Sequence, residues 1–395
     1  MNETMLALLG FATVIAIIVL LLRNVTVPAL AFVGVSTVTT AILVLTGTFT
    51  IKEMGDFIAA GVADVHSTAA LFIFSVLFFG IMNDVGLFDR IINALMKKVG
   101  TNVVGVAVMT CIIAMIGHLD GGGASTFLIT IPAMLPVYKR LKMRPTTLLL
   151  ICVTAMGVMN LLPWGGPTMR SASVLGIEAN DLWIQLMPMQ AVGIVIALVT
   201  AFVWGNIEKR RGAGVNSTLV IDYGDSDDTG VSQEQKNELA RPQFFWVNLI
   251  LTLVVILAAG VFLGVLEQSG IMNHMANVLA SFIPTSMGRF LPIIIGVLSV
   301  PLTLLFCTDS YFYGLLPVLI SVGDAFGVDP AHTAIAMVVC RNCATFISPV
   351  VPATFLGVGL AGVEIKDHIK NSFFWIWGVS ICCLISGLLL GVIVL

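Results

Sequence analysis

The chain has 395 residues, of which 58% are apolar and only 10% are charged. With a mean hydropathy of +1.04, it cannot present a water-compatible surface. This composition excludes a soluble globular protein and predicts an all-α polytopic membrane protein. We therefore expect the lipid bilayer as a partner and no binding of nucleic acid. The formal net charge of −3 carries no further information.

Apolar stretches in the first half predict membrane elements of several kinds. In chain order we expect spans at 4–22, 25–46 and 67–82, re-entrant arms at 101–138, a broken span at 146–176 and a span at 187–206. The stretch from Glu208 to Arg241 is polar and predicts a solvent-exposed linker. We therefore divide the chain into an N-terminal membrane half (1–206), a cytoplasmic linker (207–244) and a C-terminal membrane half (245–395).

The second half repeats some of these elements and lacks others. We expect spans at 245–266 and 374–395, re-entrant arms at 290–326 and a broken span at 331–361. Two amphipathic stretches, Val85–Val99 and Gly270–Ile283, predict helices that lie along the membrane interface.

The distribution of basic residues predicts the orientation. If the N-terminus is external, 15 of the 19 Lys and Arg residues fall on the cytoplasmic side, as the positive-inside rule requires. We therefore expect a multi-pass protein of the cell's inner (plasma) membrane with both termini outside. This assignment treats both pairs of arms as re-entrant; the alternative is that 101–138 forms two complete short spans.

An offset of 185 residues relates the two halves. It brings Ser125, Phe127, Pro132, Pro145 and Pro167 onto Ser310, Phe312, Pro317, Pro330 and Pro352. Prolines are rare inside helices, so three at one offset indicate a duplication. Because the predicted crossings between the copies are odd in number, we expect two inverted repeats, each with a re-entrant helical hairpin and a broken transmembrane helix. This is an architecture of secondary transporters.

The turn between each pair of arms carries small polar residues and one carboxylate. The first turn includes His118, Asp120 and three glycines, and the second includes Asp309. Non-helical backbone survives inside a membrane only where protein or water satisfies it, and an ionisable residue there indicates function. Asp120, Asp309 and His118 are therefore candidates for proton or cation coupling, although His118 could instead cap the backbone.

Each broken span contains a pair of prolines. The first break runs from Asn160 to Thr168 and the second from Ser348 to Thr354. Where a helix resumes after a break, its free N–H groups and positive dipole end suit a carboxylate substrate. A simple proline kink is the alternative at each position.

The residues that we predict to contact substrate come from these turns, breaks and their neighbours. They are Gly121, Gly123, Ser125, Thr126, Asn160, Pro163, Gly165, Gly166, Thr168, Arg170, Ser310, Tyr311, Arg341, Asn342, Ser348 and Thr354. Arg170 and Arg341 suit either an anion or the neutralisation of a nearby aspartate, and Tyr311 suits either donation to substrate or packing. The remaining histidines, including His368, fall near predicted span ends, where an interfacial position is expected. We expect no bound metal at the Cys340–Cys343 pair.

At these residues the chain resembles the citrate transporters that carry citrate complexed with a divalent metal in symport with protons. The matching residues are Leu119-Asp120-Gly121, Met159-Asn160, Pro163 to Thr168 with Arg170, Asp309-Ser310-Tyr311 with Gly314, and Ser348-Pro349 with Pro352. The resemblance implies a homodimeric elevator carrier for a citrate-like carboxylate and protons. It also implies that Mg²⁺ or Ca²⁺ travels only as part of a substrate complex, with no resident cofactor.

The chain departs from the family pattern in four ways. Gly122 replaces a second carboxylate, Thr308 replaces an asparagine, and Arg341 stands where an uncharged residue is expected. The second half also has two crossings fewer than the resemblance implies. Because a lost carboxylate and an added arginine favour a bare anion, we expect better tolerance of free di- or tricarboxylate, and we expect Gly122→Asp to favour the metal complex.

Two other functions remain alternatives on the sequence. One is an ion antiporter or channel of the same superfamily. The other is an intramembrane aspartyl protease, in which Asp120 and Asp309 share a proton, although such an enzyme needs its aspartates on facing helices.

Overall fold

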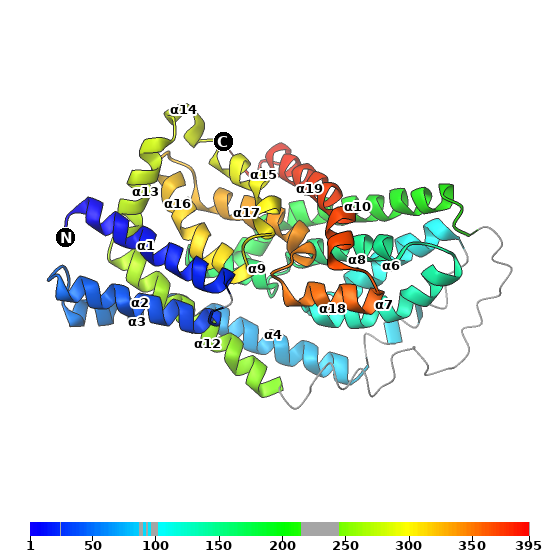
Figure 1. Cartoon of the computed structure of the whole chain (residues 1–395), viewed down its shortest axis with the longest axis horizontal. Helices are drawn as coiled ribbons and strands as arrows, with labels where there is room; N and C mark the ends of the chain where they lie inside the picture. Colours follow the sequence, from blue (N-terminus) through cyan, green and yellow to red (C-terminus); the bar gives the residue numbers. More distant parts are fainter. Residues whose placement is uncertain (24, 87–89, 92–93, 96–101, 215–244, 395) are drawn as a thin grey trace.

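A computed structural model of the chain describes residues 1–23, 25–86, 90–91, 94–95, 102–214 and 245–394 (Figure 1). Its regular secondary structure within these ranges is entirely helical, which confirms the predicted all-α class. Among the described residues, four helices are long and apolar enough to cross a membrane alone, and up to seven spans result if each of three bent helix pairs counts as one. The chain is a multi-pass membrane protein.

The chain begins with four helices that precede the first re-entrant arms. They are α1 (Glu3–Leu22), α2 (Pro28–Leu45), α3 (Ile51–Asp64) and α4 (His66–Asp84). Helix α3 was not predicted, although Thr50 and Glu53 form a capping box at its start that marks it in the sequence. Most of the predicted interfacial stretch 85–99 lies outside the described residues.

The rest of the first half forms a helical hairpin, a broken helix pair and one long helix. These are α6 (Val103–Gly117), α7 (Gly123–Arg140), α8 (Pro145–Met159), α9 (Gly166–Leu175) and α10 (Ala179–Arg210). Helix α10 starts before the predicted residue 187 and contains Pro188. The apolar pattern missed its polar first turns.

The end of α10 corrects the predicted start of the linker. Glu208 is 1% exposed, and its carboxylate accepts hydrogen bonds from Arg144 Nε at 2.5 Å and Thr147 Oγ1 at 2.7 Å. The side chain therefore lies inside the helical bundle, because a buried carboxylate needs an ionic or hydrogen-bonding partner.

The second half contains the same kinds of element after one long helix. They are α12 (Phe245–Gln268), α13 (Ile271–Phe282), α14 (Thr285–Gly288), α15 (Leu291–Thr303), the π-helix η2 (Ser310–Leu315), α16 (Leu316–Asp324), α17 (Pro330–Ala344), the 3-10 helix η3 (Thr345–Ile347), α18 (Pro352–Ala361) and α19 (Ile365–Leu389). Helix α13 bends 68° from α12 and buries one face, as an interfacial helix does.

Helix α19 corrects one predicted boundary. It begins at Ile365, before the predicted residue 374, because its first turns are polar but helical. His368 in those turns is buried within the protein, with Nε2 3.2 Å from the carbonyl oxygen of Phe346.

The same order of elements recurs in both halves. Pro145 and Pro330 each stand in the first turn of a helix, α8 and α17, and Pro167 and Pro352 do so in α9 and α18. Helices α9 and α18 both end at a glycine in the left-handed conformation, Gly176 (φ 65°) and Gly362 (φ 66°).

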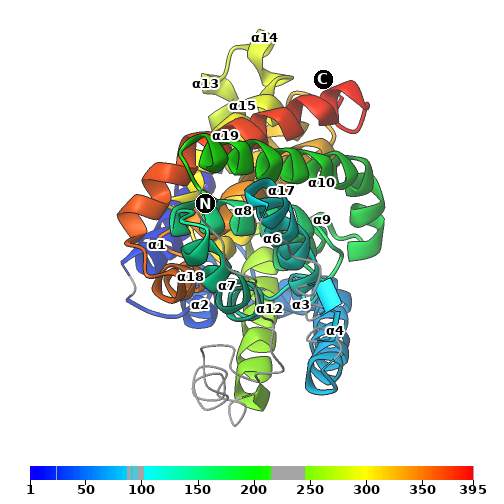
Figure 2. The same ribbon diagram turned by 90° about the vertical axis from the view of Figure 1, so that its right-hand side faces the viewer.

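Buried side chains form two large cores. One unites helices α6 to α10 with α15 to α19, and the other unites α1, α2, α3, α12 and α13 with part of η2 and α16. Gly61 of α3 lies against the backbones of Gly260 and Gly264 in α12, where any Cβ would overlap, a close approach that small residues permit in membranes. Figures 1 and 2 show α10 and α19 side by side.

Candidate functional site

The turn between α6 and α7, residues 118–122, is called tip 1. Asp120 accepts hydrogen bonds from the Gly122 backbone N–H at 2.7 Å and from the Ser125 hydroxyl. Trp164 Nε1 donates to the Leu119 carbonyl oxygen at 2.7 Å. Gly121 has φ +72°, which favours glycine. Asp120 thus serves as the acceptor that organises the start of α7.

His118 at the start of tip 1 and Thr126 in the first turn of α7 are buried. His118 Nδ1 is 2.7 Å from Thr126 Oγ1, which in turn lies 2.7 Å from the Gly122 carbonyl oxygen. The other ring nitrogen, Nε2, has no hydrogen-bond partner among the described residues. The ring meets Phe346 edge to face. His118 therefore contacts a side chain of the hairpin and leaves one polar atom open.

The non-helical segment 160–165 between α8 and α9 is called break 1. The Gly165 N–H donates to the Leu162 carbonyl oxygen at 2.7 Å across Pro163, and Thr168 Oγ1 donates to the Leu161 carbonyl oxygen at 3.1 Å. A Cβ on Gly165 would overlap the Asn160 carbonyl oxygen. Helix α9 starts without a capping side chain, so its positive end remains available.

The non-helical segment 348–351 between η3 and α18 is called break 2, and the helix that leads to it meets break 1. Asn160 Nδ2 donates to Asn342 Oδ1 at 3.2 Å. Gly157 packs against the Asn342 carbonyl oxygen, where a Cβ would come within 2.6 Å. Asn342 Nδ2 has no partner among the described residues. The two halves of the chain therefore touch through amides beside their breaks.

Arg341 is fully buried in the last turn of α17. Its Nη1 donates to Thr345 Oγ1 at 3.2 Å and its Nη2 to Thr308 Oγ1 at 3.1 Å. The guanidinium carbon lies 5.3 Å from the ring centre of Tyr311 and 5.4 Å from that of Phe312. Its Nε lacks a hydrogen-bond partner, and no carboxylate of the described residues forms an ion pair with it.

The turn before η2, residues 304–309, is called tip 2, and it is joined to α9 by an ion pair. Arg170 Nε donates to Asp309 Oδ1 at 2.7 Å, with side chains 21% and 17% exposed. The guanidinium of Arg170 also lies 6.0 Å from the ring centre of Tyr313. Of the two roles considered for Arg170, the structure has it neutralise an aspartate from the other half.

Several predicted hydroxyl groups bond within their own half. Tyr311 lies 2.6 Å from Ser299, and Ser348 Oγ donates to the Thr303 carbonyl oxygen at 2.6 Å. Ser310 Oγ lies 3.2 Å from both the thiol and the carbonyl oxygen of Cys307. These groups support the backbone and packing of tip 2 and break 2. The buried Thr354 hydroxyl has no partner among the described residues.

Two predicted glycines leave room for other side chains. A Cβ on Gly123 would overlap the ring of Phe346, and one on Gly166 would come within 2.6 Å of Arg170 Nη1. The site also includes Thr308 and Thr345, which sequence reasoning did not name as site residues. Thr345 lies four residues after Arg341, one helical turn away, and this spacing could have predicted the contact between their side chains.

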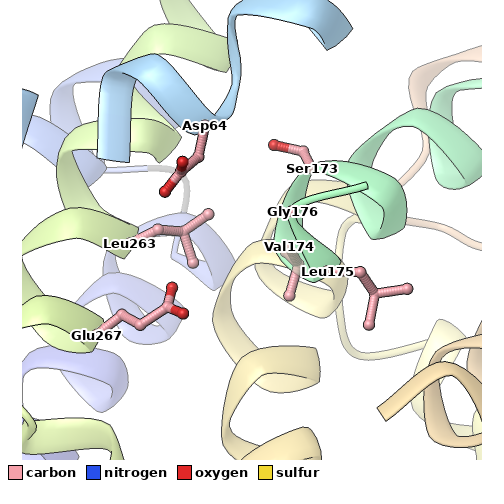
Figure 3. A pocket seen from close by; sticks show the side chains of 7 residues that line it. All are labelled: Asp64, Ser173, Val174, Leu175, Gly176, Leu263 and Glu267. Carbon is pink, nitrogen blue, oxygen red and sulfur yellow. The ribbon is translucent and has the colours of Figure 1, made fainter. Parts of the chain in front are cut away.

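A crevice lies away from these residues, between α3, α12 and the end of α9. Asp64 and Glu267 stand on one side and Ser173 on the other (Figure 3). Within the described residues, no group of three or more His, Cys, Asp or Glu side chains could hold a metal ion, and Cys340 and Cys343 are free thiols.

Comparison with known proteins gives consistent results. A family model described as citrate transporter matches residues 4–340. Two Bacillus subtilis (strain 168) relatives are each 32% identical over 439 aligned positions and cover 98% of this chain. One, named citrate transporter, is matched over 100% of its length, and the other, named Mg(2+)/citrate complex secondary transporter, over 99%. The alignments are longer than this chain, so these relatives carry residues without a counterpart here.

Proposed function

Because the chain belongs to the citrate transporter family, we propose that it is a secondary active transporter of citrate or a related di- or tricarboxylate, coupled to protons by symport. Its matched family and named relatives are transporters and not enzymes, so the protease alternative is set aside. The bundle that contains both tips and both breaks is the proposed substrate-carrying part.

The observation that carries this proposal is the buried guanidinium of Arg341. Burying a charge without a counter-ion costs several kcal/mol, so such a group marks a place where an ion of opposite sign binds. Two threonine hydroxyls and two aromatic rings hold the guanidinium in place, and its Nε remains available. A substrate carboxylate is the partner that this arrangement suits, since arginine pairs with carboxylates through parallel hydrogen bonds.

The substrate site that we propose extends from Arg341 to groups with open polar atoms or helix starts. Asn160, Asn342 and Thr354 contribute side chains, Arg170 contributes a second cation, and the starts of α9 and α18 contribute backbone N–H groups without capping side chains. The glycines of tip 1 and break 1 keep backbone accessible. Asp309 is the proposed coupling residue, with Asp120 and His118 as the alternatives.

We propose that the two halves are inverted repeats and that the protein is a homodimeric elevator carrier of the plasma membrane with both termini outside. The recurring order of elements and the matched glycine caps of α9 and α18 support the repeats. The division of the buried side chains into two cores, which meet at η2 and α16, supports a moving bundle and a static scaffold. A site at the meeting point of broken helices is typical of such carriers.

The charge of the proposed site bears on whether citrate is carried free or as a metal complex. Arg341 adds a buried positive charge that favours a free carboxylate, while one relative is named for its Mg²⁺–citrate complex. Mg²⁺ or Ca²⁺ would enter as cargo bound to citrate, since they prefer oxygen ligands.

Uptake of labelled citrate into proteoliposomes tests the function. We expect accumulation when an inward proton gradient is imposed and loss of accumulation when a protonophore is added. Panels with succinate and malate define the substrate class. If citrate uptake never exceeds equilibration, a channel or facilitator replaces this proposal, and outward movement of a second ion coupled to uptake would indicate an antiporter.

A further inference from the structure

The ion pair between Arg170 and Asp309 joins two parts of the chain that are 139 residues apart. Arg170 stands in α9, which follows break 1, and Asp309 ends tip 2. Both side chains keep partial exposure, 21% and 17%, whereas Arg341 keeps none. The pair is therefore reachable by water and by a solute that enters the site.

Arg341 is linked to this pair through Thr308, the residue before Asp309, whose hydroxyl accepts from Arg341 Nη2 at 3.1 Å. The three groups carry two positive charges and one negative charge. In this structure Asp309 pairs with Arg170, and Arg341 forms no ion pair with a carboxylate of the described residues. A substrate with two carboxylates matches both arginines only if Asp309 releases Arg170.

We infer that a substrate carboxylate replaces Asp309 as the partner of Arg170, and that Asp309 takes up a proton in the same step. This inference rests on the proposed function and assigns the coupling to an exchange of carboxylates on one guanidinium. Arg170 is thus a substrate-binding residue whose empty-state partner is the proton carrier.

The exchange balances charge and atoms. A proton from solvent adds to the Asp309 carboxylate, and the N–H groups of Arg170 turn from Asp309 to the substrate carboxylate. No covalent bond between heavy atoms forms or breaks. At Arg170 one substrate carboxylate and one proton arrive together, so the local charge there is unchanged, and a second substrate carboxylate pairs with Arg341. The carrier then returns empty with the ion pair restored, so neither Arg170 nor Asp309 moves through a low-dielectric region unpaired.

The surroundings of Asp309 single it out among the carboxylates of the site. The charged and titratable groups that interact with it or its arginine partner are Arg170 of α9, Arg341 of α17, Tyr313 of η2 and Cys307 of tip 2. Asp120, by contrast, has its acceptors occupied by tip 1 itself. Asp120 therefore holds no arginine that a substrate carboxylate could take over as its own partner.

Citrate binding to the purified protein as a function of pH tests the inference. The measurements are made across the neutral to mildly alkaline range, where citrate stays fully ionised, with Mg²⁺ and Ca²⁺ removed. Because binding requires one added proton, the Kd of the unmodified protein should rise about tenfold per pH unit while Asp309 of the empty carrier is ionised. In Asp309→Asn the Kd should not depend on pH.

A second variant keeps the test valid if Asp309→Asn is poorly folded. The double change Arg170→Gln with Asp309→Asn removes the ion pair as a unit, and it should bind citrate more weakly without a pH dependence. Calorimetry in two buffers of different protonation enthalpy should find one proton fewer taken up per citrate in both variants than in the unmodified protein.

The crevice of Figure 3 supplies the matched control. Asp64 and Glu267 line this crevice together with the end of α9, and Asp64→Asn and Glu267→Gln should keep the full pH slope. The inference is overturned if Asp309→Asn keeps the slope, or if a crevice variant loses it. Absence of citrate binding in the unmodified protein would instead overturn the proposed function.

Discussion

Tip 1 and tip 2 each carry an aspartate, but the two carboxylates have different partners. Asp120 accepts from Gly122 and Ser125 of its own turn, while Asp309 accepts from Arg170 of the other half. The first arrangement fixes local backbone, as a helix-capping acceptor does. The second depends on how the two halves sit together, so a moving carrier can use it.

The difference follows from position within the repeat. The offset of 185 residues aligns Ser125 with Ser310, but Asp120 precedes its serine by five residues and Asp309 precedes its serine by one. The two aspartates are therefore not equivalent members of a duplicated pair. What is shared between the halves is the course of the helices, and the chemistry of each tip is set separately.

The first prediction concerns the sides from which the tips enter, and its outcome is all or none. Single cysteines placed at Ser217 in the linker, outside the described residues, and at Ser286 in α14 should react with an impermeant thiol reagent from opposite sides of the membrane. A background without the native cysteines serves as the control. Labelling of both from the same side would contradict the inverted repeats and place both tips on one side.

The second prediction separates the two aspartates directly. Asp309→Asn should abolish citrate accumulation up a proton gradient while the protein still folds, because the change removes the titratable group and keeps its size. Asp120→Asn should keep coupled accumulation but lower the free energy of unfolding by about 1 kcal/mol, since an amide provides one acceptor where tip 1 needs two.

Proteoliposome uptake and thermal unfolding measure both variants. The comparison fails if Asp120→Asn loses coupling at unchanged stability, or if Asp309→Asn still accumulates citrate. In that event the carboxylate that organises tip 1 would also be the coupling residue, with His118 beside it.

The third prediction contrasts the two arginines that serve the site. Arg341→Met should raise the Kd for citrate about thirtyfold or more, because loss of one partner of a buried charge pair costs about 2–5 kcal/mol. The empty carrier should nevertheless unfold at a higher temperature, since a buried charge without a counter-ion has been removed. Arg170→Met should also weaken binding but lower the unfolding temperature, because Asp309 then loses its partner.

Differential scanning fluorimetry in the absence of citrate distinguishes these outcomes. If Arg341→Met is less stable than the unmodified protein without ligand, the contacts of the guanidinium with Thr308, Thr345 and the aromatic rings outweigh the cost of burying its charge, and its role as an open anion site fails.

The sequence predicted the course of the helices well because apolar runs, prolines and glycines act locally. It located both hairpins and both breaks, whose helices carry Pro145, Pro167, Pro330 and Pro352 in their first turns. Helix ends were less certain, since the polar first turns of α10 and α19 do not differ in composition from a loop. Helix α3 was overlooked for the same reason.

Side-chain partners were harder to predict, because they depend on residues far apart in the chain. The sequence left two roles open for Arg170, and only the meeting of α9 with tip 2 selects the ion pair with Asp309. It also suggested Tyr311 and Ser348 as substrate contacts, whereas their hydroxyls bond to Ser299 and to the Thr303 carbonyl oxygen. Local sequence patterns do not show which hydroxyl groups will form hydrogen bonds with neighbouring protein groups and so be unavailable to substrate.

The last prediction concerns the metal, and its expected effect is the smallest. The sequence suggested Gly122→Asp as a way to favour the metal complex, but a Cβ at Gly122 would overlap Ser125 Oγ and lie 3.0 Å from Asp120 Oδ2. That change should disturb the cap of tip 1 before it affects a metal.

The cleaner comparison uses the unmodified protein and Arg341→Gln, each assayed for citrate uptake with and without a chelator of Mg²⁺ and Ca²⁺. A free guanidinium accepts the extra negative charge of uncomplexed citrate, so chelation should change uptake by the unmodified protein no more than a few-fold. Arg341→Gln lacks that charge and should depend more strongly on the metal, which reduces the charge of the cargo. Strict dependence on Mg²⁺ or Ca²⁺ in the unmodified protein would show that Arg341 and the carboxylate missing at Gly122 do not make the site favour free citrate.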